Sequence, residues 1–317
     1  MPELPDLEVY REQIASRIVG DPVLHARLAS PFLLRSFDPP LKAIESKRAL
    51  SVRRMAKRIV IAFEDDLFLV FHLMIAGRFR WKEQGAKIPG KLGLLALDFP
   101  KGTLLLTEAG TTRRASLHVV RGEAALAALD PGGIEPLGAT LKAFAAALTK
   151  ERHTLKRTLT DPSVFSGIGN AYSDEIFHRA KLSPVRMTTQ LDAAEIARLH
   201  AATREVLTLW TARLRKEAGD VFPEKVTAFR AEMAVHGKYG QPCPVCGAPV
   251  QRIRYASNES NYCAPCQTGG KLLADRALSR LLKSDWPKSL DEMEAHMDAR
   301  RAAPAARAAT TPTRGRA

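Results

Sequence analysis

Four cysteines toward the C-terminal end carry the most specific chemistry in the sequence. Cys243 and Cys246 form one Cys-x-x-Cys pair, and Cys263 and Cys266 form a second pair after sixteen intervening residues. Each pair presents two sulfurs to one side of a tetrahedron, so the spacing predicts a four-thiolate zinc ribbon. Four thiolates leave no open coordination position, and one structural Zn²⁺ is therefore expected. A redox dithiol or four unrelated thiols are the alternatives.

The N-terminus offers a second kind of chemistry. Removal of Met1 would leave Pro2 first, with a secondary amine at the chain end. An α-amino group titrates near ~8, so a useful fraction is neutral at cellular pH and can attack a carbonyl-like carbon to give an iminium. Glu3 is adjacent and can donate or accept protons. An ordinary exposed terminus is the alternative interpretation.

A glycine turn at 167–170 indicates a third site. Gly169 and Asn170 stand between two helical patterns, with Lys156 upstream. Glycines permit a tight turn, and Asn170 is expected to cap the following helix, which would leave N–H groups aimed outward. This arrangement predicts a phosphate-sized site, and a plain turn between helices is the alternative.

Composition favours a polyanionic partner. The 317 residues include 48 Lys and Arg against 34 Asp and Glu, a formal net charge of +14. Nucleic acid is the first candidate and an acidic membrane surface the second. We find no run near the ~18 uncharged apolar residues of a spanning helix and no signal-peptide pattern, so a cytoplasmic protein is expected.

The elements that must position these residues follow from periodicity. Apolar spacing predicts a helix over 6–19, and short β-rich runs from 23 to 120 predict an antiparallel β domain. Asp130-Pro-Gly-Gly is a strong break, after which helical patterns appear. These patterns lie at 139–149, 154–160, 171–180, 192–216 and 271–283. The segment between the cysteine pairs reads as a β-hairpin, and the last residues as a basic tail without periodicity.

Five separate segments resemble one known family. They are PELPDLE at 2–8, Lys57 before an apolar strand, HLMIAG at 72–77, SGIGNAYSDEIF at 166–177, and the CPVC and CAPCQ pairs. In order and spacing, from residue 2 to about 267, they are similar to the formamidopyrimidine-DNA glycosylase and endonuclease VIII family of repair enzymes.

The resemblance implies an α+β architecture in four parts. These are an N-terminal β-sandwich with its helix (1–130), a helix-two-turn-helix domain (134–236), a four-cysteine zinc finger (237–268) and a helical extension with a basic tail (269–317). It also implies a monomer in the nucleoid-associated cytoplasm, whose partner is duplex DNA containing oxidised bases or abasic sites.

The implied reaction excises oxidised bases of the formamidopyrimidine and 8-oxoguanine type and then nicks the abasic site. Pro2 would form a Schiff base at C1′, Glu3 would transfer protons, and Lys57 would hold a phosphate and assist elimination. Lys156, Gly169, Asn170 and His72 would contact the DNA backbone. Arg113 and Ile75 correspond to residues that fill the gap left by a flipped base.

Several positions depart from the family pattern. Asn258 replaces an arginine that clamps phosphates, so either Arg252 or Arg254 substitutes for it or lyase chemistry weakens. Ala115 replaces an aromatic wedge, and 216–229 lacks the glycine-serine-threonine pattern of a lesion-capping loop. Three alternatives therefore stay open: an oxidised-pyrimidine enzyme of endonuclease VIII type, a damaged- or structured-DNA-binding protein without chemistry, and a zinc-ribbon RNA- or ribosome-associated protein.

Overall fold

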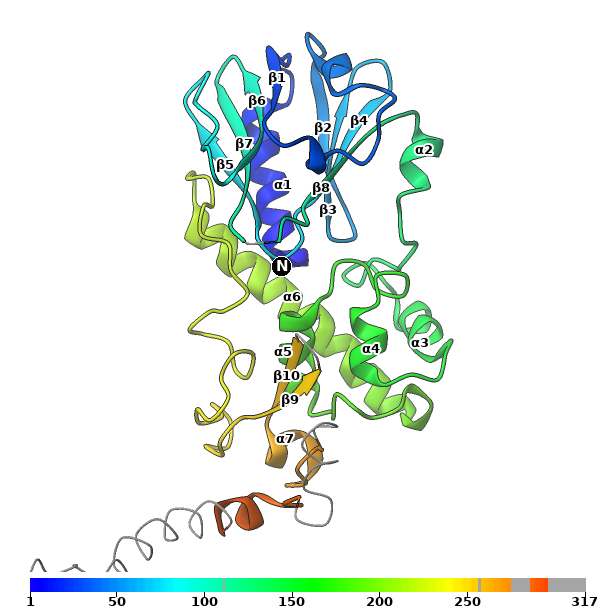
Figure 1. Cartoon of the computed structure of the whole chain (residues 1–317). Coiled ribbons are helices and arrows are strands. Elements are labelled where there is room, and N and C mark those ends of the chain that lie inside the picture. The colour runs from blue at the N-terminus through cyan, green and yellow to red at the C-terminus, as the bar shows by residue number, and fades with distance from the viewer. Residues whose placement is uncertain (111, 256–257, 275–285, 296–317) are drawn as a thin grey trace, which may run out of the picture.

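The computed structural model describes residues 1–110, 112–255, 258–274 and 286–295. Figure 1 shows two bodies, a β-sandwich and a helical domain, with the N-terminus at the junction between them. Among the described residues, no helix combines the length and apolarity needed to cross a bilayer.

The first helix, α1 (Leu4–Ile18), packs one apolar stripe into the sandwich core. Leu7, Tyr10 and Ile14 are fully buried, as their helical spacing predicts. The helix begins where Asp6 Oδ2 accepts the Glu3 backbone N–H at 3.0 Å. It ends at Val19, and Gly20 then turns the chain at a φ of +89°.

The predicted antiparallel β domain is confirmed as two four-stranded sheets. One sheet has the order β1-β6-β7-β5, with bounds His25–Leu28, Gly93–Phe99, Gly102–Glu108 and Gly77–Lys82. The other has the order β2-β3-β4-β8, with bounds Ala49–Met55, Arg58–Phe63, Leu67–His72 and Ser116–Arg121. Leu, Val, Ile and Phe side chains from both sheets meet α1 in one core.

The second half is helical, as predicted, and has a core of its own. Its helices are α3 (Leu141–Thr149), α4 (Leu155–Thr160), α5 (Asn170–Ala180) and α6 (Ala193–Ala218). The short helix α2 (Glu123–Ala127) precedes this half and packs on β3 and β4 through Leu126. Among the described residues, 3-10 turns lie at Pro31–Leu33 and Leu41–Ile44 in the first half and at Thr188–Gln190 in the second. α6 begins at an Asp192 cap whose side chain accepts the Glu195 N–H, and it ends at Gly219. The long α6 also packs against α1, which joins the two bodies.

Residues 219–230, which we call the strap, run from the end of α6 back over the sandwich. Phe222 and Val226 belong to the sandwich core although they lie in the C-terminal half of the chain. Arg78 Nε donates to Val226 O at 2.6 Å, and Glu224 forms ion pairs with Arg80 and Lys82 of β5. The sandwich core therefore takes in residues from beyond the break at 130–133.

The cysteine region folds as a hairpin followed by a short helix. The strands are β9 (Gln251–Tyr255) and β10 (Asn258–Tyr262), and α7 (Ala264–Thr268) follows. Beyond them, the predicted helix at 271–283 is wrong for its first residues, because 271–274 are not helical and Lys271 bridges to Ser289. Residues 275–285 and the predicted tail at 296–317 lie outside the described residues.

Candidate active site and zinc ribbon

Pro2 and Glu3 are buried at the junction of the two bodies, unlike an ordinary exposed terminus. In the chain as translated, burial lowers the pKa of the Met1 amino group, with Glu3 opposing the shift and Arg78 adding to it. A lowered pKa increases the neutral fraction of an amine at a given pH. The location therefore suits a nucleophilic amine.

The Glu3 carboxylate occupies the N-terminus of α5. Its Oε2 accepts the N–H groups of Gly169 at 2.8 Å and Tyr172 at 3.2 Å, and its Oε1 accepts that of Ala171 at 2.9 Å. A Cβ at position 169 would lie 2.5 Å from this carboxyl group, so the approach requires glycine. Negative charge is favourable at a helix N-terminus, so the contact also stabilises α5.

The predicted cap by Asn170 is wrong. Gly169 is the N-cap residue and Asn170 is the first residue of α5, so the cap comes from Glu3, distant in sequence. The Asn170 Nδ2 instead donates to Glu259 O at 2.8 Å, which ties α5 to β10. The amides that were expected to face outward thus hold a carboxylate of the chain itself.

Lys57 completes the cluster. It follows Ala56, whose φ is +50°, and its Nζ donates to Ile168 O at 2.8 Å, inside the glycine turn. Its side chain is buried, and burial lowers its pKa while the Glu3 charge opposes the shift. The structure therefore brings Pro2, Glu3, Lys57 and the turn at 167–170 to one place.

His72 ends β4, opposite Arg58 on the neighbouring strand. Burial, with Arg58 and Lys57 nearby, lowers its pKa to about 4. His72 is therefore neutral at neutral pH. If His72 donates a hydrogen bond to a phosphate, the donor is a neutral imidazole N–H group and not a cation.

Lys156 lies inside the helical body. Its Nζ donates to Asp174 Oδ1 at 2.6 Å and to Asn170 O at 2.8 Å. Asp174 is fully buried and also accepts bonds from Ser260 and His236. Burial acts to raise the pKa of Asp174, but Lys156 and His236 outweigh it and the pKa is lowered. In this structure Lys156 thus fastens α5 to the hairpin region.

Two exposed side chains lie on the loops that follow β4 and β7. Ile75 is 60% exposed, and Arg113 is exposed with one guanidinium nitrogen 2.7 Å from Lys91 O. Their loops adjoin, because Ala109 N–H donates to Ala76 O. Ala115, in contrast, is buried in the sandwich core and has no surface with which to enter a DNA helix.

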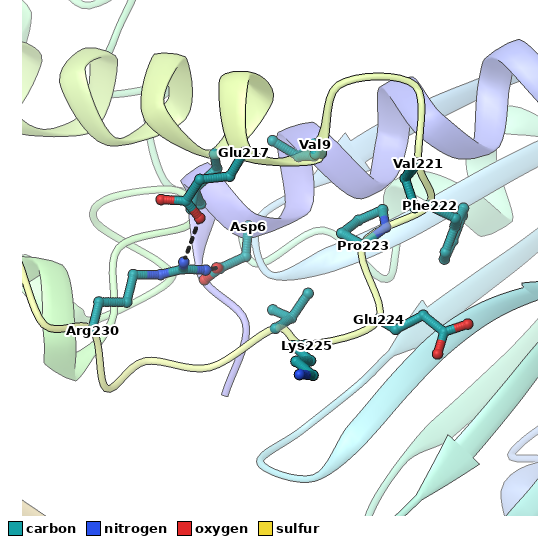
Figure 2. Close-up of a pocket in the computed structure, with 12 residues that line it drawn as sticks. Asp6, Val9, Glu217, Val221, Phe222, Pro223, Glu224, Lys225 and Arg230 are labelled. Carbon is teal, nitrogen blue, oxygen red and sulfur yellow. Dashed lines mark hydrogen bonds and ion pairs between the residues drawn. The ribbon is translucent and has the colours of Figure 1, made fainter.

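A cavity beside the N-terminus is lined in part by Glu217 and Arg230, which the sequence did not single out. Figure 2 shows Arg230 of the strap between Glu217 of α6 and Asp6 of α1. Asp6 and Arg230 are 224 positions apart, so no local pattern relates them. Burial raises the pKa of Asp6 to about 6, opposed by the Glu3 backbone N–H and by Arg230.

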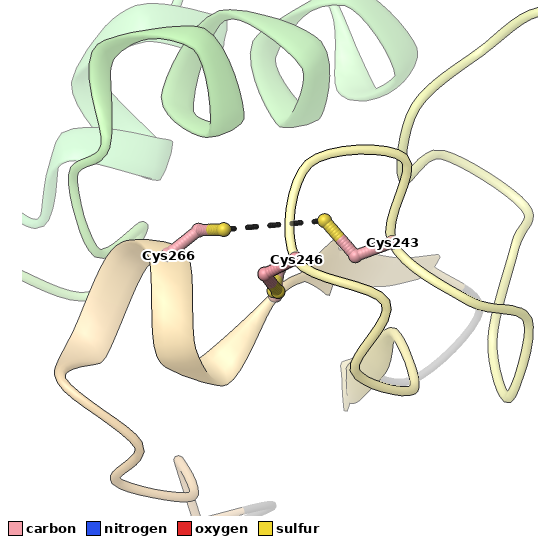
Figure 3. A group of neighbouring side chains, drawn as sticks. Cys243, Cys246 and Cys266 are labelled. Atoms are coloured by element: carbon pink, nitrogen blue, oxygen red, sulfur yellow. Dashed lines mark hydrogen bonds between the residues drawn. The ribbon is translucent and has the colours of Figure 1, made fainter.

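The four cysteines form one cluster whose geometry fits zinc. Their sulfurs lie within 4.8 Å of one another, with Cys243 and Cys266 4.0 Å apart and Cys246 and Cys263 3.3 Å apart. Four thiolates about 2.3 Å from a tetrahedral Zn²⁺ have sulfurs roughly 3.8 Å apart, so little adjustment is needed. Figure 3 shows Cys266 on α7 facing Cys243 across the site. His178 of α5 lies 3.2 Å from the Cys243 sulfur, which links the cluster to that helix.

Comparison with known proteins agrees with this geometry along the chain. Residues 1–113 match the formamidopyrimidine-DNA glycosylase N-terminal domain, 133–216 its H2TH domain, and 240–269 the zinc finger found in FPG and IleRS. A formamidopyrimidine-DNA glycosylase of Variovorax paradoxus is 32% identical over 278 residues, which cover 84% of this chain and all of that protein. The chain belongs to the formamidopyrimidine-DNA glycosylase family.

Two further relatives match different lengths of this chain. The Lactococcus lactis enzyme in complex with abasic-site DNA has a TM-score of 0.73 and 26% identity, over 84% of this chain and 99% of that one. An uncharacterized formamidopyrimidine-DNA glycosylase-like protein of Mycobacterium tuberculosis is 40% identical over 151 residues, 48% of this chain and 94% of that protein. The resemblance seen in the sequence, the α+β fold and the zinc finger are confirmed.

Arg252 and Arg254, the two candidate substitutes for the family arginine, both lie on β9. Arg252 lies opposite Asn261 in the hairpin register, stacks over the Tyr239 ring at 4.1 Å and pairs with Glu259 at 3.5 Å. The other face of β10 meets α5, because Ser260 bonds Asp174. Side chains alternate along strands, so Arg252 and Arg254 share the face turned away from α5. In the hairpin register Arg254 pairs with Glu259 and Arg252 with Asn261, so neither arginine stands opposite position 258.

Proposed function

We propose that this protein is a bifunctional DNA glycosylase and abasic-site lyase that removes oxidised bases from duplex DNA. The observation that carries the proposal is the burial of Pro2 and Glu3 together with Lys57 against the α5 N-terminus. A protein that only binds DNA has no use for a terminal amine held beside an acid and a buried lysine. Family membership and the +14 charge support DNA as the substrate.

We assign the following sequence of steps to these groups. The Pro2 nitrogen bonds to C1′ of an extruded nucleotide, the glycosidic bond breaks, and the base leaves with a proton. Transfer of a proton to the ring oxygen opens the sugar and leaves an iminium. Loss of a C2′ proton then expels the 3′ phosphate, and water releases the amine. We assign the proton transfers to Glu3, whose charge acts on the terminal amine, and the phosphate contact to Lys57, whose Nζ lies at the glycine turn.

Zinc would have no part in these steps. Cys243, Cys246, Cys263 and Cys266 would hold the ion beside a hairpin that is bonded to α5 through Asn170 and Ser260. Because all four ligands would be thiolates, the metal would supply folding energy to a region with small cores.

Borohydride trapping tests the proposal. The protein is incubated with abasic-site duplex and reduced, and the adduct is digested with trypsin. We expect the sugar on the peptide spanning residues 2–11. Lys57→Met should slow trapping, whereas Lys42→Met, at an exposed site, should not. An adduct on any other peptide, or none, would refute the assignment.

A second function is favoured by one observation. Neither hairpin arginine stands opposite position 258 in the register, which is compatible with a weaker lyase that stops after the first elimination or with a binder of damaged DNA. Cleavage products separate these cases, because a pure binder yields none and an incomplete lyase leaves an unsaturated aldehyde.

A further inference from the structure

The chain beyond the last cysteine folds onto the zinc hairpin. Leu272 N–H donates to Lys288 O at 3.0 Å, and Leu273 N–H donates to the Tyr262 hydroxyl oxygen at 2.7 Å. Leu272 also joins Ile253 and Tyr262 in a small buried core. Figure 1 shows this part of the chain at the end of the helical body that lies away from the N-terminus. The described residues of the extension, 269–274 and 286–295, thus belong to one folded unit with the hairpin.

A cavity of about 150 Å³ lies between the extension and the hairpin. Its lining includes Arg252 and Arg254 of β9, Tyr239, and Trp286 of the extension. The cavity is smaller than the ~300–1,000 Å³ of pockets for drug-sized ligands, but a cavity of ~150 Å³ can accept benzene. The space therefore suits an aromatic group of one ring.

The walls of this cavity combine a stacked guanidinium with aromatic rings. The Arg252 guanidinium carbon lies 4.1 Å from the centroid of the Tyr239 ring, and Arg252 also pairs with Glu259 at 3.5 Å. Aromatic rings and guanidinium planes are the surfaces on which proteins stack the bases of single-stranded nucleic acid, because every base has a π-face. Cations at the same place favour a ring that is attached to phosphates. These walls therefore favour a nucleotide over an uncharged aromatic ligand.

One polar atom of the lining residues lacks a partner. Trp286 Nε1 is buried and has no hydrogen-bond acceptor among the described residues. A buried donor without a partner is costly, and native proteins rarely keep one without a reason. Pyrimidine bases have a single ring and carry carbonyl oxygens that accept such a bond, whereas adenine has two fused rings and no carbonyl. Size and hydrogen bonding thus favour the same class of base.

We propose that this cavity binds the pyrimidine base of an unpaired DNA nucleotide, with a carbonyl oxygen accepting the Trp286 Nε1–H. The inference rests on DNA as the ligand, as proposed above, and adds a second binding site away from Pro2. Bases inside a duplex are stacked and paired, so only a nucleotide at a gap, a strand end or an open segment enters the cavity. The site holds the protein where single-stranded and double-stranded DNA meet.

Three short single strands of equal length and charge separate base binding from phosphate binding. They are an oligothymidylate, an oligoadenylate and a strand of propanediol phosphates without bases. The wild type should bind oligothymidylate roughly 5–100-fold more tightly than the base-free strand, as expected for stacking of one base. Oligoadenylate should bind more weakly than oligothymidylate. Equal binding of the thymine and base-free strands would overturn the proposal, and so would tighter binding of the adenine strand.

Variants at Trp286 locate the bound base. Trp286→Phe keeps a ring but has no N–H, so it should lose about 2–10-fold in affinity for oligothymidylate. Trp286→Leu has no ring and should bind the thymine and base-free strands alike. Trp81→Phe changes a partly buried tryptophan of the sandwich and is the matched control, with unchanged affinities. A full thymine preference in Trp286→Leu would overturn the proposal.

Blunt undamaged duplex distinguishes base binding from support of the hairpin. It offers no unpaired base, so both Trp286 variants should bind it as the wild type does and keep their zinc. Equal losses on duplex and single strand would show that Trp286 only supports the fold, against the proposal. Borohydride trapping on abasic duplex tests the glycosylase separately. A thymine preference without trapping would refute the proposed function and leave this site in place.

Discussion

Glu3 has two contacts that constrain its chemistry. Its side chain receives three backbone N–H groups from the start of α5, and its backbone N–H is held by Asp6. Fixed donors hold the carboxyl group in one orientation, so under the proposed mechanism Glu3 would transfer a proton from one position. At this scale, one side chain joins the N-terminus to the helical body.

We expect Glu3→Gln to lower base excision by about 10²-fold or more, since a positioned acid or base typically contributes 10²–10⁴-fold. The amide has one acceptor oxygen, so at least one of the three α5 bonds is lost. Single-turnover rates on damaged duplex measure the effect. Glu232→Gln, at an exposed position, should behave as the wild type. Equal rates in the two variants would remove Glu3 from the mechanism.

Asp6 makes stability depend on pH. Burial raises its pKa from 3.8 to about 6, so between pH 4 and 6 the folded chain holds a proton that the unfolded chain releases. The contribution of Asp6 protonation to the free energy of unfolding is therefore fully present below pH 4. It declines by on the order of 3 kcal/mol as the pH rises to 6. Asp6→Asn lacks this decline.

Urea unfolding of both proteins at pH 4 and pH 7 measures the difference. The free energy of unfolding of Asp6→Asn minus that of the wild type should be larger at pH 7 than at pH 4. A constant difference would show that Asp6 titrates normally in the fold.

Helix α5 is the element that connects the two candidate sites. Its first turn holds the Glu3 carboxylate, Asp174 bonds Ser260 of the hairpin, and His178 lies against Cys243. Glu3 and the zinc hairpin are therefore both bonded to the same short helix.

Cys263→Ser should remove the single zinc ion and unfold the hairpin, because metal binding supplies the folding energy of a small ribbon. Native mass spectrometry should show one ion per wild-type chain and none in the variant. Amide exchange should increase in β9 and β10 but not in the sandwich, whose core is separate. Retained protection in the hairpin would show that its packing suffices without metal.

Asn258→Arg should restore the cation that the family pattern has at this position. We expect more product of the second elimination relative to the first, because a bidentate cation holds the departing phosphate. Arg252→Gln, on the other face of the hairpin, should leave that product ratio unchanged. A lower ratio in Arg252→Gln, with no change in Asn258→Arg, would mean that Arg252 is the functional substitute.

At the scale of the whole molecule, the strap makes the two bodies interdependent. Phe222 packs on Tyr10 with ring centroids 5.8 Å apart, and Arg17 donates to Asp220 O at 2.7 Å. These contacts connect the end of α6 to α1 across the junction that holds the N-terminus. The junction is therefore lined by both halves of the chain.

Deleting residues 296–317 should weaken DNA binding without changing lesion preference. This segment has five arginines and one aspartate, so it contributes 5 − 1 = +4. Each phosphate contact that is lost lowers the slope of log K against log salt by about 0.9. Titrations of damaged and undamaged duplex at several salt concentrations should show equal losses. A loss confined to damaged DNA would give the segment a role in recognition.

The sequence by itself determined the parts that depend on local spacing. Two Cys-x-x-Cys pairs identify the zinc ligands, alternation and helical periodicity identify the strands and helices, and Pro2 and Glu3 are neighbours in any fold. Five segments in register then sufficed to identify the family. Such features can be predicted from the sequence because the residues that form them are only a few positions apart.

Only the tertiary structure decided the contacts between distant residues. Glu3 and Gly169 are 166 positions apart, and Lys57 and Ile168 are 111 apart. The sequence therefore suggested a local cap by Asn170 and gave no sign of the pair between Arg230 and Asp6. Which distant groups meet depends on how two cores and a strap pack together, and the free energy of that packing is spread over the whole chain.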